Sequence, residues 1–463
     1  MSQAATNENK MGVMKVRKLL ISMSLPMIIS MLVQALYNIV DSMYVSYIPD
    51  TGTVVNAGEM ALAALGYAFP AQNLMIAVAT GTGVGVNALL SKSLGEKNFE
   101  RANLTARNAI FLATCNFVVF ALLGGFFSEF FFRMQTQDPI IVGYGKSYLQ
   151  ICTLLSFGLF GQVMFERLLQ STGKTFYTMI TQGVGAIFNI IFDPFFIYGW
   201  CGFPKMGVAG AALATVLGQI IAFFLAIFYN VRKNEEISLN MRGFRPNKHI
   251  IGKIYSVGVP SIIMASIGSV MTFGMNKILT IFSSTATAVF NVYFKLQSFV
   301  FMPVFGLNNG MVPIVAYNYG ARKPDRIMQT VKLGICVAVG IMMVGLLAFE
   351  AFPHLLLGIF NASGNMLRIG IIALRIIGIH LLVAGFDIVC SSMFQALGHG
   401  MLSLFVSILR QLVILLPAAY ILAMVGGLDA VWWAFPVAEC GSMICCIFFL
   451  RYIYRKEILP LKG

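Results

Sequence analysis

Acidic side chains within long apolar segments are the residues of this sequence best suited to chemistry. Asp41 lies in such a segment, and Gln34 and Asn38 precede it on the same segment. At about 3.6 residues per helical turn these three side chains share one helix face. In a later apolar segment, Asp193 follows Asn189 by one turn. An ionised carboxylate is costly in hydrocarbon, so both acids are candidates for function.

The two acids are predicted to meet at one depth. Asp41 lies about 20 residues into its segment, and Thr215 lies about 12 Å into the segment that begins at Gly207, at roughly 1.5 Å per residue. Two neighbouring carboxylates in a low dielectric cannot both stay charged cheaply, so one should hold a proton near physiological pH. With Asn189 and Thr215 oxygens added, the group also suits sodium. The structural alternative is a packed acid at position 41 and a simple helix end at Asp193.

Further polar residues lie at the depth of a central cavity. Asp387 and Arg410 fall at comparable depth, so a structural ion pair is the alternative to a substrate-facing acid. Glu166 and Arg167 are adjacent, and we expect a local, structural role for them. The set predicted to line a substrate cavity or to give secondary coupling comprises Gln34, Gln72, Lys295, Gln297, Asp387 and Glu439.

Pro26 lies in the first apolar segment, before Asp41. It removes one backbone hydrogen bond and favours a bend. A moving hinge and a static kink are equally compatible with the sequence.

The elements that position these residues are membrane helices. The chain has 463 residues, of which 58% are hydrophobic and 11% charged, with a mean hydropathy of +0.82. This composition excludes a soluble protein of this size. Apolar runs long enough to cross a bilayer occur near 18 to 47, 60 to 90, 103 to 127, 140 to 169, 176 to 199, 207 to 231, 250 to 282, 285 to 317, 327 to 350, 366 to 396, 401 to 424 and 428 to 451.

The sequence repeats itself when 225 is added to the residue number. Matching positions are Gln72 and Gln297, Gly81 and Gly306, Gly85 and Gly310, Gly95 and Gly320, Arg101 and Arg326, Gln170 and Gln395, and Gly173 and Gly398. Pro26 and Pro260 match at 234, because the first half has a longer loop around Pro49 to Met60. The predicted fold is therefore all-α, with twelve transmembrane helices in two six-helix lobes related by an internal pseudo-two-fold repeat. The predicted domains are an N-lobe (1–231), a hydrophilic linker (232–249) and a C-lobe (250–463).

The distribution of basic residues predicts the orientation. Of the Lys and Arg residues in tails and connections, 21 lie on the side of both termini, against Arg133 and Lys205 on the other side. The positive-inside rule places both termini in the cytoplasm. The same distribution explains the net charge of +14 by membrane orientation, so nucleic acid is not expected as a partner.

Other functional classes lack their motifs. No Gly-x-x-x-x-Gly-Lys-Ser/Thr sequence occurs, so ATP is not expected as the energy source. Eight cysteines without Cys-x-x-Cys spacing indicate neither a disulfide framework nor a zinc site. Four scattered histidines do not suggest an enzyme, and no cofactor is expected beyond a coupling ion, H⁺ or Na⁺.

Ordered motifs over essentially the whole chain resemble the multidrug and toxic compound extrusion (MATE) transporters. They are Pro26, Tyr37 and Asp41; Asn189-Ile-Ile-Phe-Asp193-Pro194; Gly207-Val-Ala-Gly-Ala-Ala-Leu-Ala-Thr215; Pro303 to Gly310 with Pro313 to Ala321; and Arg410-Gln411 before Pro417. The resemblance implies a two-lobe antiporter. It also implies a cation site at Asp41, Asn189, Asp193 and Thr215, with Tyr37 and Asn38 beside it and Pro26 at a bend. Asp387 resembles an acid that other members use in the second lobe.

The resulting hypothesis is a multi-pass protein of the cell membrane that exports amphipathic, often cationic compounds by H⁺- or Na⁺-coupled alternating access. Its partners would be small molecules and the lipid bilayer. The alternative is a lipid-linked precursor flippase of the same superfamily. A flippase needs a strongly basic cavity for a pyrophosphate, whereas the membrane-embedded charges here include at least as many acids as bases.

Overall fold

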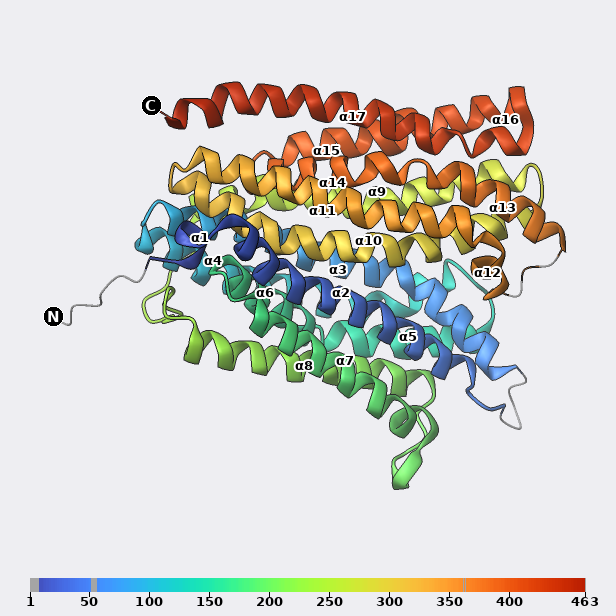
Figure 1. The fold of residues 1–463 in the computed structure, drawn as a ribbon. Coiled ribbons are helices and arrows are strands. Elements are labelled where there is room, and N and C mark those ends of the chain that lie inside the picture. Colours follow the sequence, from blue (N-terminus) through green and yellow to red (C-terminus); the bar gives the residue numbers. More distant parts are fainter. Residues whose placement is uncertain (1–7, 51–55, 361, 363, 463) are drawn as a thin grey trace.

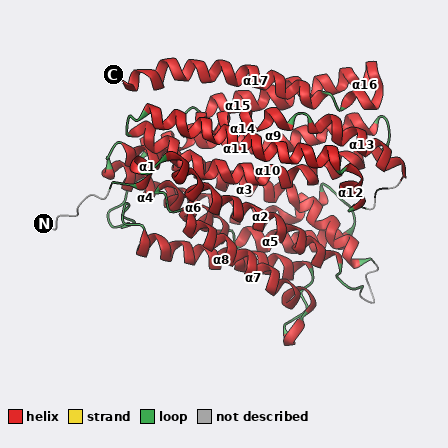
Figure 2. Cartoon of the chain, viewed as in Figure 1, coloured by secondary structure: helices red, strands yellow, loops and turns green. Residues whose placement is uncertain are grey.

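A computed structural model describes residues 8–50, 56–360, 362 and 364–462 (Figure 1). Within these ranges the regular elements are all helices (Figure 2). Ten helices are long and apolar enough to cross a membrane, and two bent pairs bring the number of described spans to twelve. The predicted all-α membrane fold is confirmed.

The N-lobe consists of the first six spans and two short elements. Its helices are α1 (Lys10–Val13), α2 (Val16–Ser46), α3 (Ala57–Gly95), α4 (Phe99–Arg133), α5 (Pro139–Leu154), α6 (Phe157–Ser171), α7 (Thr175–Tyr198), a 3₁₀ turn (Trp200–Gly202) and α8 (Val208–Lys233).

The C-lobe repeats this plan. Its helices are α9 (Lys248–Thr280), α10 (Ser284–Gly320), α11 (Pro324–Ala351), α12 (Pro353–Gly358), α13 (Gly364–Gly378), α14 (Leu381–Ala396), α15 (Gly400–Ile408), a π-helical turn (Leu409–Leu415), α16 (Leu416–Val431), α17 (Ala434–Ile453), a second π-helical turn (Tyr454–Ile458) and a final 3₁₀ turn (Leu459–Lys462).

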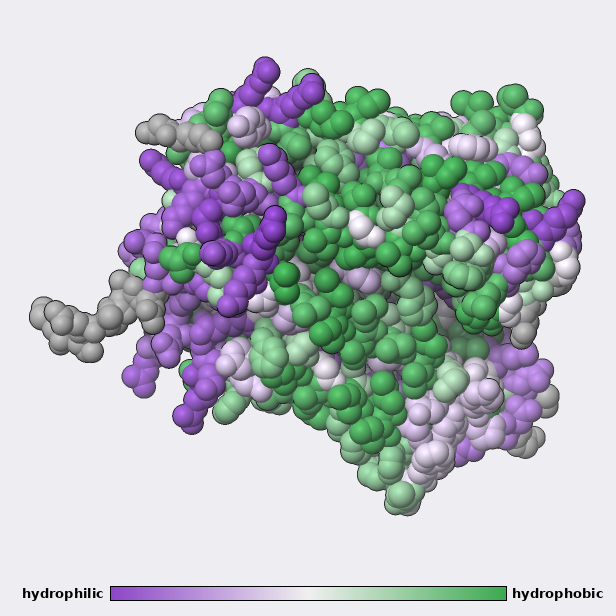
Figure 3. Space-filling view, viewed as in Figure 1, coloured by the Kyte–Doolittle hydropathy of each residue, from purple (hydrophilic) through white to green (hydrophobic). Residues whose placement is uncertain are grey.

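The helices run side by side, and the two lobes lie on either side of the contact between α2, α3, α9 and α10 (Figure 1). The loop that joins the lobes covers 234–247, inside the predicted linker, although the exact domain boundaries stay a prediction. This loop, the first described helix α1 and the final 3₁₀ turn lie at the same end of the molecule, which we call the basic end (Figure 1). Hydrophilic residues gather there and, more sparsely, at the opposite end, with an apolar surface between them (Figure 3).

The fourth and tenth spans are bent at matching positions of the two repeats. The bend between α5 and α6 is 45°, and the bend between α13 and α14 is 49°. The first bend lies at 155–156 and the second at 379–380, a separation close to the offset of the repeat. Because the bend occurs at the same place in both copies, we interpret it as a feature of the repeated six-helix unit.

The first span does not break at Pro26. The α2 helix is continuous from Val16 to Ser46, and the Ser30 hydroxyl donates to the Pro26 carbonyl oxygen at 3.0 Å. Since Pro26 has no N–H, the helix lacks one backbone bond at this level. The structure therefore shows an intact helix at the residue where the sequence favours a bend. Whether Pro26 acts as a hinge stays a prediction.

Candidate functional site

Three N-lobe helices bring the predicted acidic site together. Helix α7 carries Asn189 and Asp193, which are 2% and 0% exposed, and α8 carries Thr215. With the Asn189 amide oriented to satisfy its partners, its nitrogen donates to Asp193 Oδ2 at 3.1 Å. Its oxygen accepts from the backbone N and the Oγ1 of Thr215, at 3.1 and 3.0 Å. Asn189 therefore ties α7 to the start of α8.

Helix α2 adds the second carboxyl group. The Asp41 and Asp193 carboxyls lie close to each other, so a hydrogen bond between them requires one proton. Asp41 Oδ1 and Asp193 Oδ1 are buried acceptors without a donor. Tyr37, one turn before Asp41, lies near Gln34, and both residues line the cavity described below. Asn38, which the sequence predicts beside this group, is exposed on α2.

The chemistry of this donor set fits a proton or a hard cation. Within the described ranges, no cluster of three or more His, Cys, Asp or Glu side chains could hold a metal ion. A cation here would need neutral oxygens beside the two carboxylates. Asn189 and Thr215 supply such oxygens, but they already bond to each other. The unpartnered oxygens of Asp41 and Asp193 are thus the open acceptors.

A cavity of about 150 Å³ extends from this group toward the basic end. It begins at Tyr37, Asn189 and Thr215 and reaches Glu166 and Arg167 on α6. Amide side chains line much of it, namely Gln34, Gln162, Gln170, Gln182, Gln219 and Asn309. Methionines and branched aliphatic residues complete the wall, including Met27, Met31, Ile76, Leu159 and Val163. The cavity therefore combines polar amides with deformable apolar side chains.

Glu166 and Arg167 bond to these amides. Glu166, 3% exposed, accepts from Gln162 at 3.0 Å, Thr181 at 2.8 Å and Gln182 at 2.7 Å. Arg167 donates to Gln170 at 2.8 Å and to Asn309 of the C-lobe at 2.9 Å. The two residues, for which the sequence predicts a local, structural role, thus belong to a wider network that lines the cavity.

The remaining predicted cavity residues lie in different places. Gln72 on α3 donates to the Tyr148 hydroxyl at 3.0 Å and faces Cys152, and both of these residues lie on α5. Lys295 is exposed on α10, with its ammonium 6.0 Å from the Phe360 ring centroid. Its neighbour Gln297 is half-buried on the same helix.

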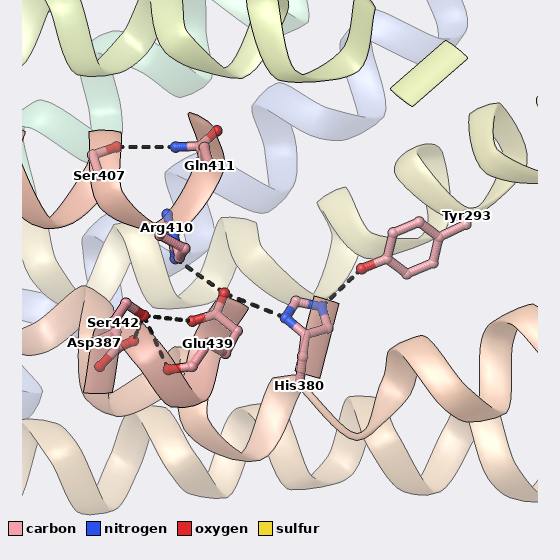
Figure 4. A network of polar contacts seen from close by, with 8 residues as sticks. All are labelled: Tyr293, His380, Asp387, Ser407, Arg410, Gln411, Glu439 and Ser442. Carbon is pink, nitrogen blue, oxygen red and sulfur yellow. Dashed lines mark hydrogen bonds and ion pairs between the residues drawn. The ribbon is translucent and has the colours of Figure 1, made fainter. Parts of the chain in front are cut away.

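Glu439 is the centre of a buried polar network in the C-lobe (Figure 4). Its Oε1 accepts from Arg410 Nη1 at 3.1 Å and lies 3.4 Å from His380 Nδ1. The other ring nitrogen of His380 bonds to the Tyr293 hydroxyl at 2.8 Å. Arg410 lies in the π-helical turn between α15 and α16, and His380 lies at the bend of the tenth span. Two helix irregularities thus direct their side chains at one carboxylate.

Asp387 belongs to the same network but does not make the ion pair with Arg410 that was the structural alternative for it. Its Oδ2 accepts from the Ser442 hydroxyl, whereas Arg410 pairs with Glu439. Asp387 is 1% exposed, and its Oδ1 has no donor in the described structure. Figure 4 shows Asp387 and Glu439 on either side of Ser442.

Sequence reasoning missed several members of both networks. Tyr293 and Ser442 are ordinary residues of apolar helices, so no pattern singles them out. Gln162 and Gln182 carried a weak signal, because an amide in an apolar span needs a partner. Gln162 also precedes Glu166 by one helical turn.

Comparisons with known proteins agree with this architecture. A family model described as MatE matches residues 26–195 and 260–421, one segment in each lobe. The multidrug export protein MepA of Staphylococcus saprophyticus is 25% identical over 431 residues, covering 93% of this chain and 92% of that protein.

Two solved structures give the same result. One is described as the outward-facing conformation of a multidrug resistance MATE family transporter of the MOP superfamily, and another as MATE in the straight conformation. Each has a TM-score of 0.88, 25% identity and 99% coverage of both chains.

Proposed function

Because this chain belongs to the MATE family of multidrug export transporters, we propose that it is a cation-coupled antiporter that moves amphipathic, often cationic compounds outward by alternating access. The observation that carries the proposal is the Asp41 and Asp193 pair. The two carboxyls lie close together, and each has a buried Oδ1 acceptor without a donor. A buried acid pair of this kind changes its charge when it gains or loses one cation.

The proposed coupling is competition for this negative charge. When the site faces outward, a proton on one carboxyl oxygen, or a sodium ion between the carboxylates, neutralises the pair and releases a bound cationic compound. When the site faces inward, the ion leaves and the exposed charge again favours the compound. In the ion-free site, Asn189 holds Asp193 in position and is itself fixed by its bonds to Thr215, which tie α7 to α8.

The donor set supports either coupling ion. A proton needs only the two carboxyls, because it can reside on one and bond to the other. Sodium needs several hard oxygens, which Asn189 and Thr215 would add after giving up their mutual bond. Sodium coupling therefore requires the Thr215 oxygen as a ligand, whereas proton coupling does not.

The wall of the cavity supports a broad, amphipathic substrate class. Met27 and Met31 are flexible and polarisable, and Tyr37 presents an aromatic ring. Such surfaces accept flat cations of different shapes without specific hydrogen bonds. The charged wall residues Glu166 and Arg167 balance each other, which does not favour the pyrophosphate of a lipid-linked precursor.

We further propose that the basic end lies in the cytoplasm of a cell-membrane protein. The excess of Lys and Arg in the connections at that end supports this orientation. Cysteine labelling with a membrane-impermeant reagent on intact cells should reach Cys201, in the exposed turn at the opposite end, before it reaches a cysteine placed in the 234–247 loop.

The proposal is tested by efflux of a fluorescent lipophilic cation from vesicles under an imposed H⁺ or Na⁺ gradient. The wild type should respond to one of the gradients, and Asp41→Asn should lose that response at equal expression. Glu59→Gln, which changes an exposed acid at the far end of α3, is the matched control and should behave as wild type. Ion-driven efflux that persists in Asp41→Asn would refute the proposed coupling.

A further inference from the structure

The glycines that mark the internal repeat lie where helices of one lobe cross helices of the other. Three pairs share the numbering offset of 225, namely Gly81 with Gly306, Gly85 with Gly310, and Gly95 with Gly320. The first member of each pair is on α3 and the second on α10. All six lie in the half of these helices that leads to the basic end.

The last pair makes a mutual contact between α3 and α10. A Cβ added at Gly95 would lie 2.0 Å from the carbonyl oxygen of Tyr317, and one added at Gly320 would lie 2.1 Å from the carbonyl oxygen of Lys92. Lys92 and Tyr317 are themselves related by the same offset. The contact of Gly95 with Tyr317 and the contact of Gly320 with Lys92 are therefore equivalent in the two repeats. The crossing of α3 and α10 follows the pseudo-two-fold symmetry of the fold.

The middle pair extends this contact to the first helix of the opposite lobe. A Cβ at Gly85 would lie 2.0 Å from the Ile254 carbonyl oxygen on α9, and one at Gly310 would lie 2.6 Å from Ser24 Cα on α2. Real Cβ atoms do not approach backbone this closely. The Ser24 hydroxyl also donates to the Leu307 carbonyl oxygen at 3.1 Å, across the same crossing.

The first pair also contacts the first helix of the opposite lobe. A Cβ at Gly81 would lie 2.5 Å from Ile262 Cγ1, and one at Gly306 would lie 2.6 Å from Ile28 Cα. Ile28 and Ile262 differ by 234, the offset that relates Pro26 to Pro260. The three glycines of α3 and the three glycines of α10 thus make equivalent contacts on the two sides of the lobe interface.

The N-terminal segment joins the lobes at the same end. Arg326 Nη2, from the C-lobe, donates to the carbonyl oxygens of Met11 at 3.0 Å and Met14 at 2.7 Å. Asn9 donates to the carbonyl oxygen of Thr172 in the N-lobe at 3.2 Å. Residues 9–14 therefore bridge the lobes just beyond the last glycine pair.

We propose that the three repeated glycine pairs form the gate that seals the cytoplasmic side of the transporter, and that their lack of side chains sets the balance between its two conformations. This inference rests on the proposed alternating access, in which contacts between lobes at the closed side must separate while contacts within a lobe persist. Without Cβ atoms the backbones can touch and the gate closes fully. One added methyl group would hold the helices apart and favour the conformation open at the basic end.

The test measures distances between spin labels in Gly95→Ala and Gly320→Ala proteins. One label pair, at Glu100 and Lys332, reports the basic end, and both positions are exposed. A second pair, at Tyr47 and Ile281, reports the opposite end, where these residues are 71% and 61% exposed. The labels are introduced after replacement of the accessible native cysteines.

Each gate variant should raise the population with a long basic-end distance about tenfold over its parent, because two such states differ by only a few kcal/mol. The distance at the opposite end should shorten in the same molecules. Gly66→Ala on α3 and Gly340→Ala on α11 are the controls, since an added Cβ meets open space at both positions, and neither should shift.

An unchanged basic-end distance in both folded gate variants would overturn the inference. A longer basic-end distance without closure at the opposite end would uphold the gate and contradict alternating access. If Gly95→Ala does not fold, Gly81→Ala is the milder variant, because its methyl meets the Ile262 side chain first. It should shift the distances in the same direction by a smaller amount, and a folded Gly81→Ala protein with unshifted distances would equally overturn the gate.

Discussion

Replacing Glu439 by glutamine should destabilise the C-lobe, because it removes the charge that compensates the half-buried guanidinium of Arg410. Glu439 is 6% exposed and accepts from Arg410 at 3.1 Å, with His380 Nδ1 at 3.4 Å from the same oxygen. The carboxylate is largely shielded from solvent, so the pair is the main source of compensation for Arg410. Glutamine keeps the shape and one acceptor oxygen but loses the charge.

The expected loss is about 2–3 kcal/mol. Breaking a buried ion pair from one side costs roughly 3–5 kcal/mol. The Arg410 side chain keeps 24% exposure, which favours the lower end of this range, and the remaining amide oxygen of glutamine recovers part of the bond. Adding Arg410→Met should restore about 1 kcal/mol or more, because the double variant no longer buries an unpaired charge.

Thermal unfolding in detergent of the two single variants and the double variant measures this coupling. Glu350→Gln is the matched control, since Glu350 and Arg375 are 3.6 Å apart but 42% and 53% exposed, and such surface pairs contribute about 1 kcal/mol at most. The reasoning is refuted if Glu439→Gln unfolds like wild type, or if the two substitutions at Glu439 and Arg410 are additive.

Three further predictions concern other parts of the molecule. Asn189→Leu removes two hydrogen bonds to Thr215, worth about 1 kcal/mol each, and should raise the ion concentration needed for half-maximal efflux roughly tenfold or more. Burial raises the pKa of Glu236, in the loop between the lobes, so its contribution to stability is full below pH 4.5 and is lost as the pH rises through the raised pKa. Glu236→Gln should therefore flatten the fall in unfolding temperature with rising pH, and an unchanged profile would contradict this. Gly145→Ala should lower the free energy of unfolding by about 1–3 kcal/mol, since its Cβ would lie 2.0 Å from the Phe132 ring. Gly143→Ala, in open space on the same helix, should raise it by up to about 1 kcal/mol. Thermal unfolding that ranks the two variants the other way would refute the packing of α5.

Depth along a span could be predicted from the sequence, because each helix rises by a fixed amount per residue. For this reason Asn189 and Thr215, on antiparallel neighbours, are expected at one level, and they lie 3.0 Å apart. The repeat also identified the two lobes, since glycines that contact backbone cannot vary freely. The fold and the family resemblance are confirmed.

The direction in which a side chain points was harder to predict. Arg410 and Asp387 share a depth, yet the π-helical turn at Leu409–Leu415 directs Arg410 to Glu439. His380 reaches the same carboxylate because the tenth span bends there, and the sequence has no proline at that bend to announce it. Irregular helix geometry depends on packing between spans, which a pattern along one segment does not contain.

The most direct test of the central claim is the affinity of purified protein for a fluorescent lipophilic cation, measured at several pH values and sodium concentrations. Competition for the Asp41 and Asp193 carboxylates predicts that one of the two ions raises the wild-type Kd in proportion to its concentration. In Asp41→Asn this dependence should disappear while the protein remains folded. A wild-type Kd that is independent of both ions, or an ion dependence that survives in Asp41→Asn, would contradict the account.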